Sequence, residues 1–279
     1  MILSGKARLA GVIGWPVSHS RSPRLHGFWL EQLGIDGAYL PLAVAPENLE
    51  MVIRALPRMG FRGVNLTVPH KEAVMALVDE LEPLATRIGA VNTIAVRDDG
   101  SLLGRNTDAF GFLENLRHTS PGWCPEAAPA VVIGAGGAAR AVVAALIDAR
   151  VPAIRLVNRS AERAARLAAD LGGPVTVVDW AERAACLEDA GLLVNTTTLG
   201  MTGQSNLDLD LSALPVSALV NDIVYVPLET DLLARARARG NPVVDGLGML
   251  LHQAVPGFEA WFGVRPEVSG QLRSFVLGS

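Results

Sequence analysis

The sequence of 279 residues is short of cysteine and of basic charge, and these shortages exclude several classes of protein. Its two cysteines, Cys124 and Cys186, cannot form a disulfide framework or a cysteine-ligated zinc site. The 28 acidic residues outnumber the 24 basic ones, whereas nucleic-acid binders usually have an excess of basic charge. No apolar run approaches the roughly 18 residues of a membrane span, and the N-terminus has no secretory signal. We therefore expect a cytoplasmic protein of about two domains, with neither a nucleic-acid nor a membrane partner.

Histidine and lysine are also sparse. The five histidines show no metal-ligand spacing, so we predict no metal site. Of the 24 basic residues, 22 are arginine, and the two lysines are Lys6 and Lys71. Because the chain otherwise uses arginine for its cations, a lysine in it needs a specific explanation.

The sequence does contain an alternation of apolar strands and helices. In the N-terminal part we expect strands at 8–13, 38–44, 63–68, 91–96 and 101–103, and helices at 22–34, 46–59, 70–79 and 109–116. Ser22 and Pro23 suit a helix start, with Ser22 as the N-cap. After a proline-rich stretch we expect strands at 130–133, 154–157, 174–178, 192–195 and 219–223, and helices at 138–149, 161–171, 247–261 and 267–277. This alternation is typical of an α/β fold with a doubly wound parallel sheet.

A glycine-rich turn follows the strand expected at 130–133 and opens the next helix. Its six residues fit the dinucleotide-binding pattern G-x-G-x-x-G/A and are Gly134, Ala135, Gly136, Gly137, Ala138 and Ala139. Glycine lets the backbone approach a pyrophosphate, and the helix N-terminus offers free N–H groups to it. A glycine cluster alone is weak evidence, but the strand before it and the helix after it indicate a nucleotide site.

The residues after the strand at 154–157 indicate which dinucleotide binds. An NAD site usually has an acidic residue there for the ribose 2′-hydroxyl, whereas this chain has Asn158, Arg159 and Ser160, with Arg163 one turn later. Guanidinium groups suit the extra 2′-phosphate of NADP(H). A solvated basic helix start is the alternative interpretation, and we favour NADP(H) over NAD.

The position of Lys71 indicates a catalytic role. Lys71 follows the strand at 63–68, and ligands of α/β sheets bind beyond such strand ends. Carbonyl reduction needs a proton donor, and lysine can release a proton whereas arginine cannot. Asp108 could orient Lys71. Two ordinary roles stay open, a solvated lysine at a helix start and an aspartate N-cap.

Further polar residues lie among apolar ones. Ser20 and Ser22 could bind a carboxylate, although helix capping explains Ser22 equally well. Asn92 and Asn106 are each followed by a threonine, and such amides and hydroxyls suit a polyhydroxylated small molecule.

Nine ordered motifs give the chain a resemblance to the shikimate dehydrogenase family, whose members reduce 3-dehydroshikimate in aromatic amino-acid biosynthesis. The motifs run through the whole chain and stand at 14–23, 65–71, 89–93, 104–108, 134–140, 158–160, 195–201, 222–230 and 245–253. Two small departures are Trp15, in a variable position, and Ser160, where threonine is common. Neither departure alters a chemical role.

The resemblance implies an NADP(H)-dependent oxidoreductase acting on a CH–OH group, with Lys71 and Asp108 as the catalytic pair. The residues implied to bind shikimate or 3-dehydroshikimate are Ser20, Ser22, Thr67, Lys71, Asn92, Asp108, Tyr225 and Gln253. The residues implied to bind NADP(H) are the six of the glycine-rich turn with Asn158, Arg159, Ser160, Arg163, Met201, Ile223 and Gly246.

The resemblance also implies how the chain is divided. An α/β substrate-binding domain at 1–108 would be completed by C-terminal helices at 247–279. A connecting helix and linker at 109–129 would lead to a Rossmann-like domain at 130–246. The active site would lie in the cleft between the two domains, in a monomer or a homodimer.

Three alternatives stay open. A quinate/shikimate dehydrogenase with relaxed cofactor use is the nearest one, although Arg159 argues against NAD. A methylene-tetrahydrofolate dehydrogenase shares the architecture but leaves the loop of Ser20 and Ser22 unexplained. A non-catalytic NADP(H)-binding sensor would be expected to lack Lys71 or Asp108, and both are present.

Overall fold

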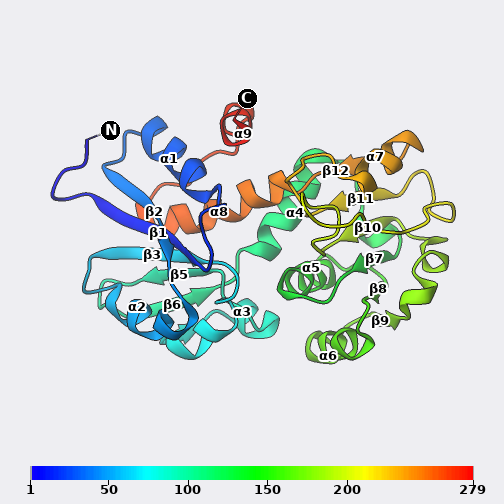
Figure 1. The fold of residues 1–279 in the computed structure, drawn as a ribbon, viewed down its shortest axis with the longest axis horizontal. Helices are drawn as coiled ribbons and strands as arrows, with labels where there is room; N and C mark the ends of the chain where they lie inside the picture. Colours follow the sequence, from blue (N-terminus) through cyan, green and yellow to red (C-terminus); the bar gives the residue numbers. More distant parts are fainter. Residues whose placement is uncertain (1, 279) are drawn as a thin grey trace. The chain divides into compact units, whose positions relative to one another are not determined.

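The protein consists of two compact units, each built on a six-stranded sheet (Figure 1). The computed structural model describes residues 2–278. The first unit runs to Thr107 and resumes at Leu250, and the second is Asp108–Met249. The predicted α/β class is confirmed. Within residues 2–278, no helix is both long and apolar enough to cross a membrane.

The sheet of the first unit is mixed. In spatial order its strands are β2 Gly37–Ala43, β1 Arg8–Gly14, β3 Phe61–Leu66, β5 Thr93–Val96, β6 Leu102–Arg105 and β4 Glu80–Leu81. The first three run parallel, whereas β5 is antiparallel to both β3 and β6. The strands expected at 91–96 and 101–103 therefore form an antiparallel hairpin, with its turn at 98–100.

Helices cover both faces of this sheet (Figure 1). They are α1 Ser22–Gln32, α2 Leu49–Ala55, α3 Pro83–Ile88, α8 Leu247–Phe262 and α9 Gly270–Leu277, with the 3-10 helices η1 Pro46–Asn48 and η2 Ala73–Leu77. The first three residues of α8 belong to the second unit. The helix expected at 46–59 is thus shorter than the sequence predicted.

The α-helix expected at 70–79 is wrong, and only η2 forms there. One contact with another segment uses a backbone group that a helix would need, and a second contact fixes the His70 side chain. The backbone N–H of Val91 donates to the Lys71 carbonyl at 2.8 Å, so this carbonyl is bonded to another segment. The His70 ring is buried and its Nε2 lies 2.8 Å from the carbonyl oxygen of Val44. Lys71 therefore lies on a turn whose backbone is tied to the start of the β5 segment.

The second unit has a parallel sheet. In spatial order its strands are β12 Val243–Val244, β11 Leu219–Asp222, β10 Leu192–Asn195, β7 Ala130–Ile133, β8 Ile154–Val157 and β9 Val175–Val178. Its helices are α4 Asp108–Thr119, α5 Gly137–Asp148, α6 Ala161–Leu171 and α7 Asp231–Ala238, with η3 Pro125–Ala127, η4 Trp180–Glu182 and η5 Ala185–Leu187. Numbered from β7, the order is 6-5-4-1-2-3, which is the doubly wound arrangement of dinucleotide-binding domains.

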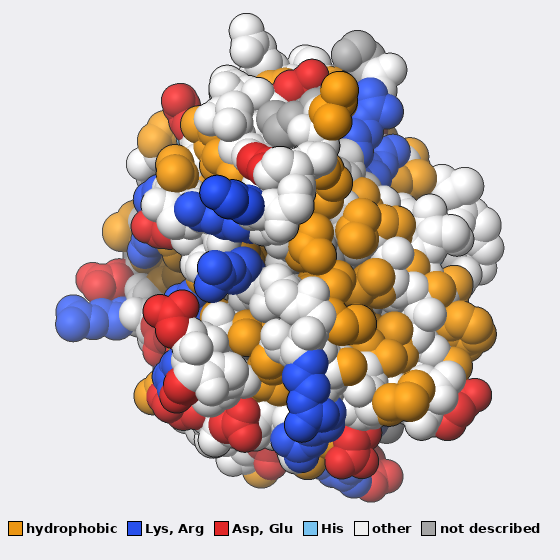
Figure 2. Space-filling view, turned by 90° about the vertical axis from the view of Figure 1, so that its left-hand side faces the viewer, with side chains coloured by type: hydrophobic (Ala, Val, Ile, Leu, Met, Phe, Trp, Pro, Cys, Tyr) orange, Lys and Arg blue, Asp and Glu red, His pale blue; other side chains and the backbone are white. Residues whose placement is uncertain are grey.

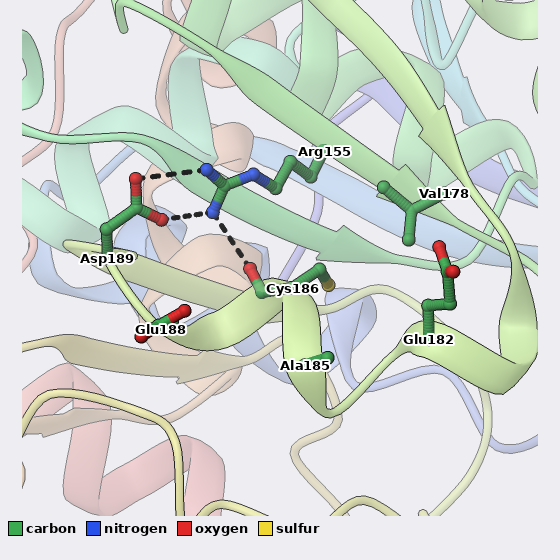
Figure 3. A pocket seen from close by; sticks show the side chains of 7 residues that line it. All are labelled: Arg155, Val178, Glu182, Ala185, Cys186, Glu188 and Asp189. Atoms are coloured by element: carbon green, nitrogen blue, oxygen red, sulfur yellow. Dashed lines mark hydrogen bonds and ion pairs between the residues drawn. The ribbon is translucent and has the colours of Figure 1, made fainter.

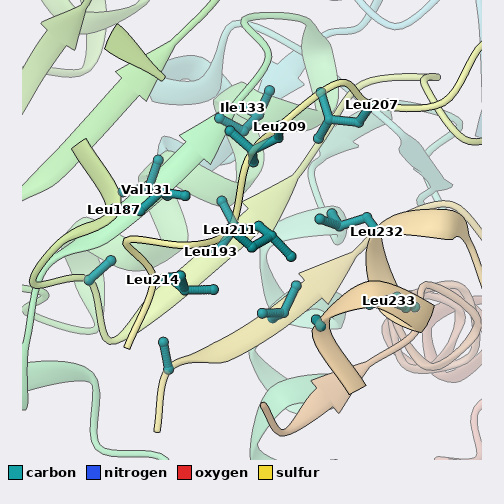
Figure 4. Close-up of a cluster of buried hydrophobic side chains, with 14 of the residues drawn as sticks. Val131, Ile133, Leu187, Leu193, Leu207, Leu209, Leu211, Leu214, Leu232 and Leu233 are labelled. Carbon is teal, nitrogen blue, oxygen red and sulfur yellow. The ribbon is translucent and has the colours of Figure 1, made fainter. Parts of the chain in front are cut away.

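One face of this sheet is covered by a leucine-rich segment without regular structure (Figure 4). The segment is anchored by four buried leucines, which are Leu207, Leu209, Leu211 and Leu214. Arg235 of α7 donates hydrogen bonds to the carbonyls of Leu207 and Leu209 at 2.9 and 2.7 Å. The leucine side chains of this segment therefore cover the sheet, although the segment itself forms no strand.

Charged side chains of both signs lie close together on the face drawn in Figure 2, with apolar side chains gathered beside them. Exposed ion pairs of the described chain, such as Arg97–Glu80 and Arg62–Asp98, have their charged atoms within 4 Å of each other. Exposed ion pairs contribute little to stability, because water and salt screen the charges. The folding free energy therefore comes mainly from the buried cores.

The aromatic core of the first unit encloses His26. Its ring stacks on Tyr39 with centroids 3.9 Å apart, and Trp29, Phe258 and Trp261 surround it at 5.6 to 5.9 Å. His26 is fully buried, and neither ring nitrogen has a hydrogen-bond partner among the described residues. Burial lowers the pKa of His26 to about 3. This histidine is therefore neutral in the folded protein and charged in the unfolded chain below about pH 6.5.

His26 should make the folded protein sensitive to acid. Below pH 6.5 the unfolded chain binds a proton that the folded chain excludes until about pH 3, so stability falls as the pH falls. Between pH 7 and pH 5 the loss is about 2 kcal/mol of unfolding free energy from this group. In urea titrations at a series of pH values, His26→Phe should reduce the pH dependence of the unfolding free energy by that amount. Equal pH slopes for wild type and His26→Phe would contradict this account.

Candidate functional site

The glycine-rich turn lies at the carboxyl edge of the parallel sheet. It leaves β7 after Ile133 and enters α5 at Gly137. The strand order reverses between β7 and β10, and ligands of doubly wound sheets bind at this point. Thr196 follows β10, and its Oγ1 donates to the Ile133 carbonyl at 2.7 Å. Of the six motif residues, Gly134 and Ala139 are buried and the half-buried ones are Ala135, Gly136, Gly137 and Ala138.

Two glycines of this turn are present for different reasons. Gly134 has φ +112°, and a Cβ there would lie 2.5 Å from Thr196 Oγ1, so the fold itself requires glycine. Gly136 has φ −97°, which any residue can adopt, and a Cβ there would meet nothing within 4 Å. Local packing therefore does not explain Gly136. Bare backbone facing open space at the start of a 12-residue helix fits the close approach of a dinucleotide pyrophosphate.

The next predicted group connects β8 to α6. Ser160 Oγ accepts a hydrogen bond from the Arg163 N–H at 3.4 Å and so caps α6. Asn158 Nδ2 donates to the Ser160 carbonyl at 2.9 Å. The side chains of Asn158 and Ser160 therefore shape this turn. Arg159 and Arg163 are exposed, and residues 158–161 include no carboxylate.

Met201, Ile223 and Gly246 follow the carboxyl ends of three neighbouring strands, β10, β11 and β12. A Cβ at position 246 would lie 2.1 Å from the Ile223 carbonyl oxygen, so glycine permits these two loops to meet. Tyr225 is half-buried in the loop that begins at Ile223, and Met201 is 40% exposed. The structure thus collects these residues at the same edge as the glycine-rich turn.

A buried carboxylate at this edge was missed by the sequence analysis. Asp222 Oδ1 accepts from Asn195 Nδ2 and from the Val224 N–H, both at 3.0 Å, and Oδ2 accepts from Thr230 Oγ1 at 2.7 Å. Burial raises the pKa of Asp222 in spite of these hydrogen bonds. Asp222 therefore ties the loop after β11 to the end of β10. The sequence feature that could have indicated this role is a polar residue at the end of each of two buried strands, Asn195 in β10 and Asp222 in β11.

In the first unit, the Asn92 side chain is the centre of a buried polar network. Its Oδ1 accepts from the Thr107 N–H at 2.8 Å, and its Nδ2 donates to Thr107 Oγ1 at 3.0 Å and to Gln253 Oε1 at 3.3 Å. Asn92, Thr107 and Gln253 are 2, 3 and 8% exposed. Two residues predicted to bind substrate, Asn92 and Gln253, are therefore brought together from positions 161 residues apart.

The same network continues through two residues that the sequence analysis did not assign. Asn65 Nδ2 donates to Thr93 Oγ1 at 3.0 Å, and its Oδ1 accepts from Tyr39 Oη at 2.5 Å. Tyr39 is also hydrogen-bonded to Ser22. Burial raises the pKa of Tyr39 well above its ordinary value, and the bond to Ser22 opposes that shift. Ser22 is thereby linked to the amide network.

The predicted capping role of Ser22 is wrong. Ser22 is the first residue of α1, Arg21 is the N-cap, and no side chain caps this helix. Ser22 is 7% exposed, and its hydroxyl bonds Tyr39 instead. Ser20 Oγ accepts from the Ser22 N–H at 3.3 Å. The predicted binding of a carboxylate by Ser20 and Ser22 stays a prediction.

The loop that carries these serines lies beside the loop that carries Thr67. The Trp15 N–H donates to the Val68 carbonyl at 3.1 Å. A Cβ at Gly14 would lie 2.5 Å from Thr67 Cγ2, so glycine allows the close approach. The start of the serine-containing loop and Thr67 are therefore packed together in the first unit.

Lys71 lies on the turn next to the Asn92 segment, because its carbonyl accepts from the Val91 N–H at 2.8 Å. Asp108 is the first residue of α4, is 7% exposed, and directly follows Thr107 of the amide network. The pairing of Lys71 with Asp108 stays a prediction.

A cavity of about 670 Å³ lies elsewhere on the second unit (Figure 3). Arg155 lines it and is held by both oxygens of Asp189 and by the Cys186 carbonyl. None of the residues predicted to bind cofactor or substrate lines this cavity.

Three protein-family models match the chain. The shikimate dehydrogenase substrate binding domain matches residues 12–94, and the shikimate / quinate 5-dehydrogenase model matches residues 124–201. The shikimate 5′-dehydrogenase C-terminal domain matches residues 246–270. The matched segments cover the serine-containing loop, the glycine-rich turn and the whole of α8.

Relatives and solved structures match over nearly the whole chain. A shikimate dehydrogenase (NADP(+)) of Paramagnetospirillum magneticum is 81% identical over 275 residues, which are 99% of this chain and 100% of that relative. A Thermus thermophilus shikimate 5-dehydrogenase, solved with NADP(H) and shikimate, is 40% identical with a TM-score of 0.87 and covers 98% and 100% of the two chains. A Corynebacterium glutamicum quinate dehydrogenase, solved with NAD, is 32% identical with a TM-score of 0.91 and covers 98% and 99%.

The two glycines of the turn should respond differently to alanine. Gly136→Ala should leave the melting temperature unchanged but weaken NADP⁺ binding about tenfold or more, because hydrogen bonds to a charged group are worth roughly 1.5–3 kcal/mol. Gly134→Ala should destabilise the fold by about 1–3 kcal/mol, because its φ is positive and Thr196 blocks the Cβ. Thermal melts and calorimetric titration separate the two effects. Undiminished NADP⁺ binding by Gly136→Ala would show that the open space has no role in cofactor binding.

Proposed function

The chain belongs to the shikimate dehydrogenase family, and on that premise we propose that it catalyses the reversible NADPH-dependent reduction of 3-dehydroshikimate to shikimate. Relatives at 53–81% identity are named shikimate dehydrogenase (NADP(+)). The structural observation that carries the proposal is the strand end at β8. It has Arg159 and no acidic residue, on the sheet whose glycine-rich turn keeps open space at Gly136.

We propose that the first unit binds the substrate. Ser20, Ser22 and Thr67 bind its carboxylate, which suits hydroxyl donors packed on adjacent loops. Asn92 and Gln253 bind its ring hydroxyls. An amide both donates and accepts hydrogen bonds, so a bound hydroxyl can replace the present contact between Asn92 and Gln253 without leaving either group unsatisfied. Tyr225 of the second unit is a further proposed substrate contact.

The second unit would hold NADP(H). The amides of the turn at 134–139 would receive the pyrophosphate, and Arg159 and Arg163 the 2′-phosphate. Asn158 and Ser160 shape the turn that presents these arginines. Met201, Ile223 and Gly246 would border the nicotinamide. When bound, NADPH supplies a hydride to the ketone carbon.

Lys71 provides the proton that completes the reduction. Its Nζ–H donates to the substrate ketone oxygen, and Nζ is left deprotonated when the alcohol has formed. In the reverse reaction, Nζ takes the hydroxyl proton. Asp108 binds a neighbouring substrate hydroxyl and orients Lys71. General acid–base catalysis of this kind typically contributes 10²–10⁴-fold.

Quinate oxidation is the second candidate activity, because the quinate dehydrogenase structure is as similar in fold as the shikimate enzymes are. The absence of a carboxylate among residues 158–161 favours NADP(H) over NAD for this chain. Its cytoplasmic location and its state as monomer or homodimer stay predictions.

Substitution of Lys71 tests the proposed proton transfer. Lys71→Ala should lower kcat for shikimate oxidation at least about 100-fold. Lys71→Arg should lose a similar factor, because a guanidinium keeps the charge but cannot release a proton. NADP⁺ binding should stay normal in both. The matched control is Lys6→Arg, which changes the other lysine of the chain and should keep full turnover.

Turnover near the wild-type level in Lys71→Arg, with a normal rise of rate with pH, would overturn this role. Lys71 would then act only as a fixed positive charge.

A further inference from the structure

The register of two neighbouring strands places Trp180 beside Arg159. β8 and β9 are parallel, with Val157 paired to Val178. Arg159 and Trp180 each lie two residues beyond this pair, and the Arg159 Cζ lies 5.6 Å from the Trp180 ring centroid. A guanidinium within about 6 Å of an indole is attracted by the negative face of the ring.

The Arg159 guanidinium contacts the indole of Trp180. Among the described residues, no hydrogen bond or ion pair holds Arg159, which is exposed. Without Trp180, this long side chain would be free to sample many rotamers in solvent. The indole therefore restricts a cation that otherwise has no fixed position.

Trp180 is itself held in place. Its ring is partly buried against the apolar cluster on that face of the sheet. Asp179 Oδ1 accepts from the Ala181 N–H at 2.8 Å and caps η4. Arg183 lies 5.0 Å from the ring centroid and donates to the Trp180 carbonyl at 2.9 Å. The indole is therefore a rigid support for Arg159.

Arg183, the second cation at this ring, is committed to other contacts. Its Nε donates to the Asp208 carbonyl at 2.9 Å, and its Nη2 to an Asp208 carboxylate oxygen at 3.2 Å. Its side chain is 22% exposed. Arg183 therefore fixes the loop around Trp180, and Arg159 is the cation of this pair that remains available to an anion.

We propose that Trp180 is a positioning residue for cofactor preference, because it holds the Arg159 guanidinium ready for the 2′-phosphate of NADP(H). This inference rests on the proposed function, since it concerns the same dinucleotide site. A guanidinium held over a ring by a cation–π contact keeps its N–H groups available to a phosphate. Ordering this side chain before binding removes part of the entropy cost of association. Trp180 thus favours NADP(H) without touching the phosphate.

The alternative role for the same indole is stacking against the adenine ring. Adenine is common to NADP(H) and NAD, so stacking would strengthen the binding of both to the same extent. Support for Arg159 strengthens only the ligand with the 2′-phosphate. The two roles are therefore distinguished by paired ligands that differ in this group alone.

The test is calorimetric titration of the full-length protein with 2′,5′-ADP and with 5′-AMP. Trp180→Leu should raise the Kd of 2′,5′-ADP about two- to fivefold, the range of an exposed cation–π contact, and leave that of 5′-AMP unchanged. Trp180→Phe, which retains a ring, should recover part of the loss. The matched control is Trp123→Leu, a change at another half-buried tryptophan of the second unit, which should alter neither Kd.

A second test measures whether the effect of Trp180 on ligand binding depends on Arg159. In an Arg159→Ala background, Trp180→Leu should have no further effect on 2′,5′-ADP. In steady-state assays, Trp180→Leu should raise KM for NADP⁺ with kcat unchanged. If Trp180→Leu fails to fold, Trp180→Phe is measured alone and must still show a selective loss.

The inference is overturned by equal weakening of both ligands, by a loss that persists in Arg159→Ala, or by no loss at all. It is also overturned if the wild-type protein does not prefer 2′,5′-ADP to 5′-AMP. Oxidation of shikimate by the wild-type protein with NADP⁺ reports separately on the proposed function.

Discussion

The side-chain amide of Asn92 joins three segments of the first unit that are distant in sequence. It bonds Thr107 at the end of the β6 segment and Gln253 on α8, and Thr93 beside it is bonded to Asn65 of β3. A buried amide must have its hydrogen bonds satisfied, or the desolvation cost of about 1–3 kcal/mol per group is not recovered. Strand β3, the β5 and β6 segments and helix α8 are therefore arranged so that their polar side chains meet around Asn92. We propose that the same polar groups recognise the substrate.

The second unit satisfies a different constraint. A parallel sheet gathers the loops after its strands at one edge, and the strand order reverses beside the glycine-rich turn. Gly134 and Gly246 are glycine because other atoms come too close for a Cβ. Gly136 is glycine with open space in front of it. Gly134 and Gly246 are therefore required by the packing of the loops at this edge, whereas we attribute the glycine at position 136 to ligand binding.

The sequence pattern predicted five of the six strands of the second unit, because a short apolar run between turns can be recognised without knowledge of its distant neighbours. The two-residue strand β12 was not predicted. The helix expected at 70–79 does not form. The backbone N–H of Val91, 20 residues beyond Lys71, donates a hydrogen bond to the Lys71 carbonyl, which a continuous helix would use internally. The cap expected at Ser22 is wrong because α1 begins at Ser22 itself, so that Arg21 stands at the N-cap position. Asn65, Asp222 and Trp180 gain their roles only from strand register and burial, which local patterns do not contain. The roles of the predicted site residues stay predictions.

The most direct test of the central claim is one spectrophotometric experiment at 340 nm on the purified wild-type protein. It pairs shikimate and quinate with NADP⁺ and NAD⁺ in all four combinations. We expect the highest kcat/KM for shikimate with NADP⁺, lower values when either the substrate or the cofactor is replaced, and the lowest value for quinate with NAD⁺. A kcat/KM for quinate with NAD⁺ that equals or exceeds that for shikimate with NADP⁺, or no turnover of shikimate, would contradict this expectation.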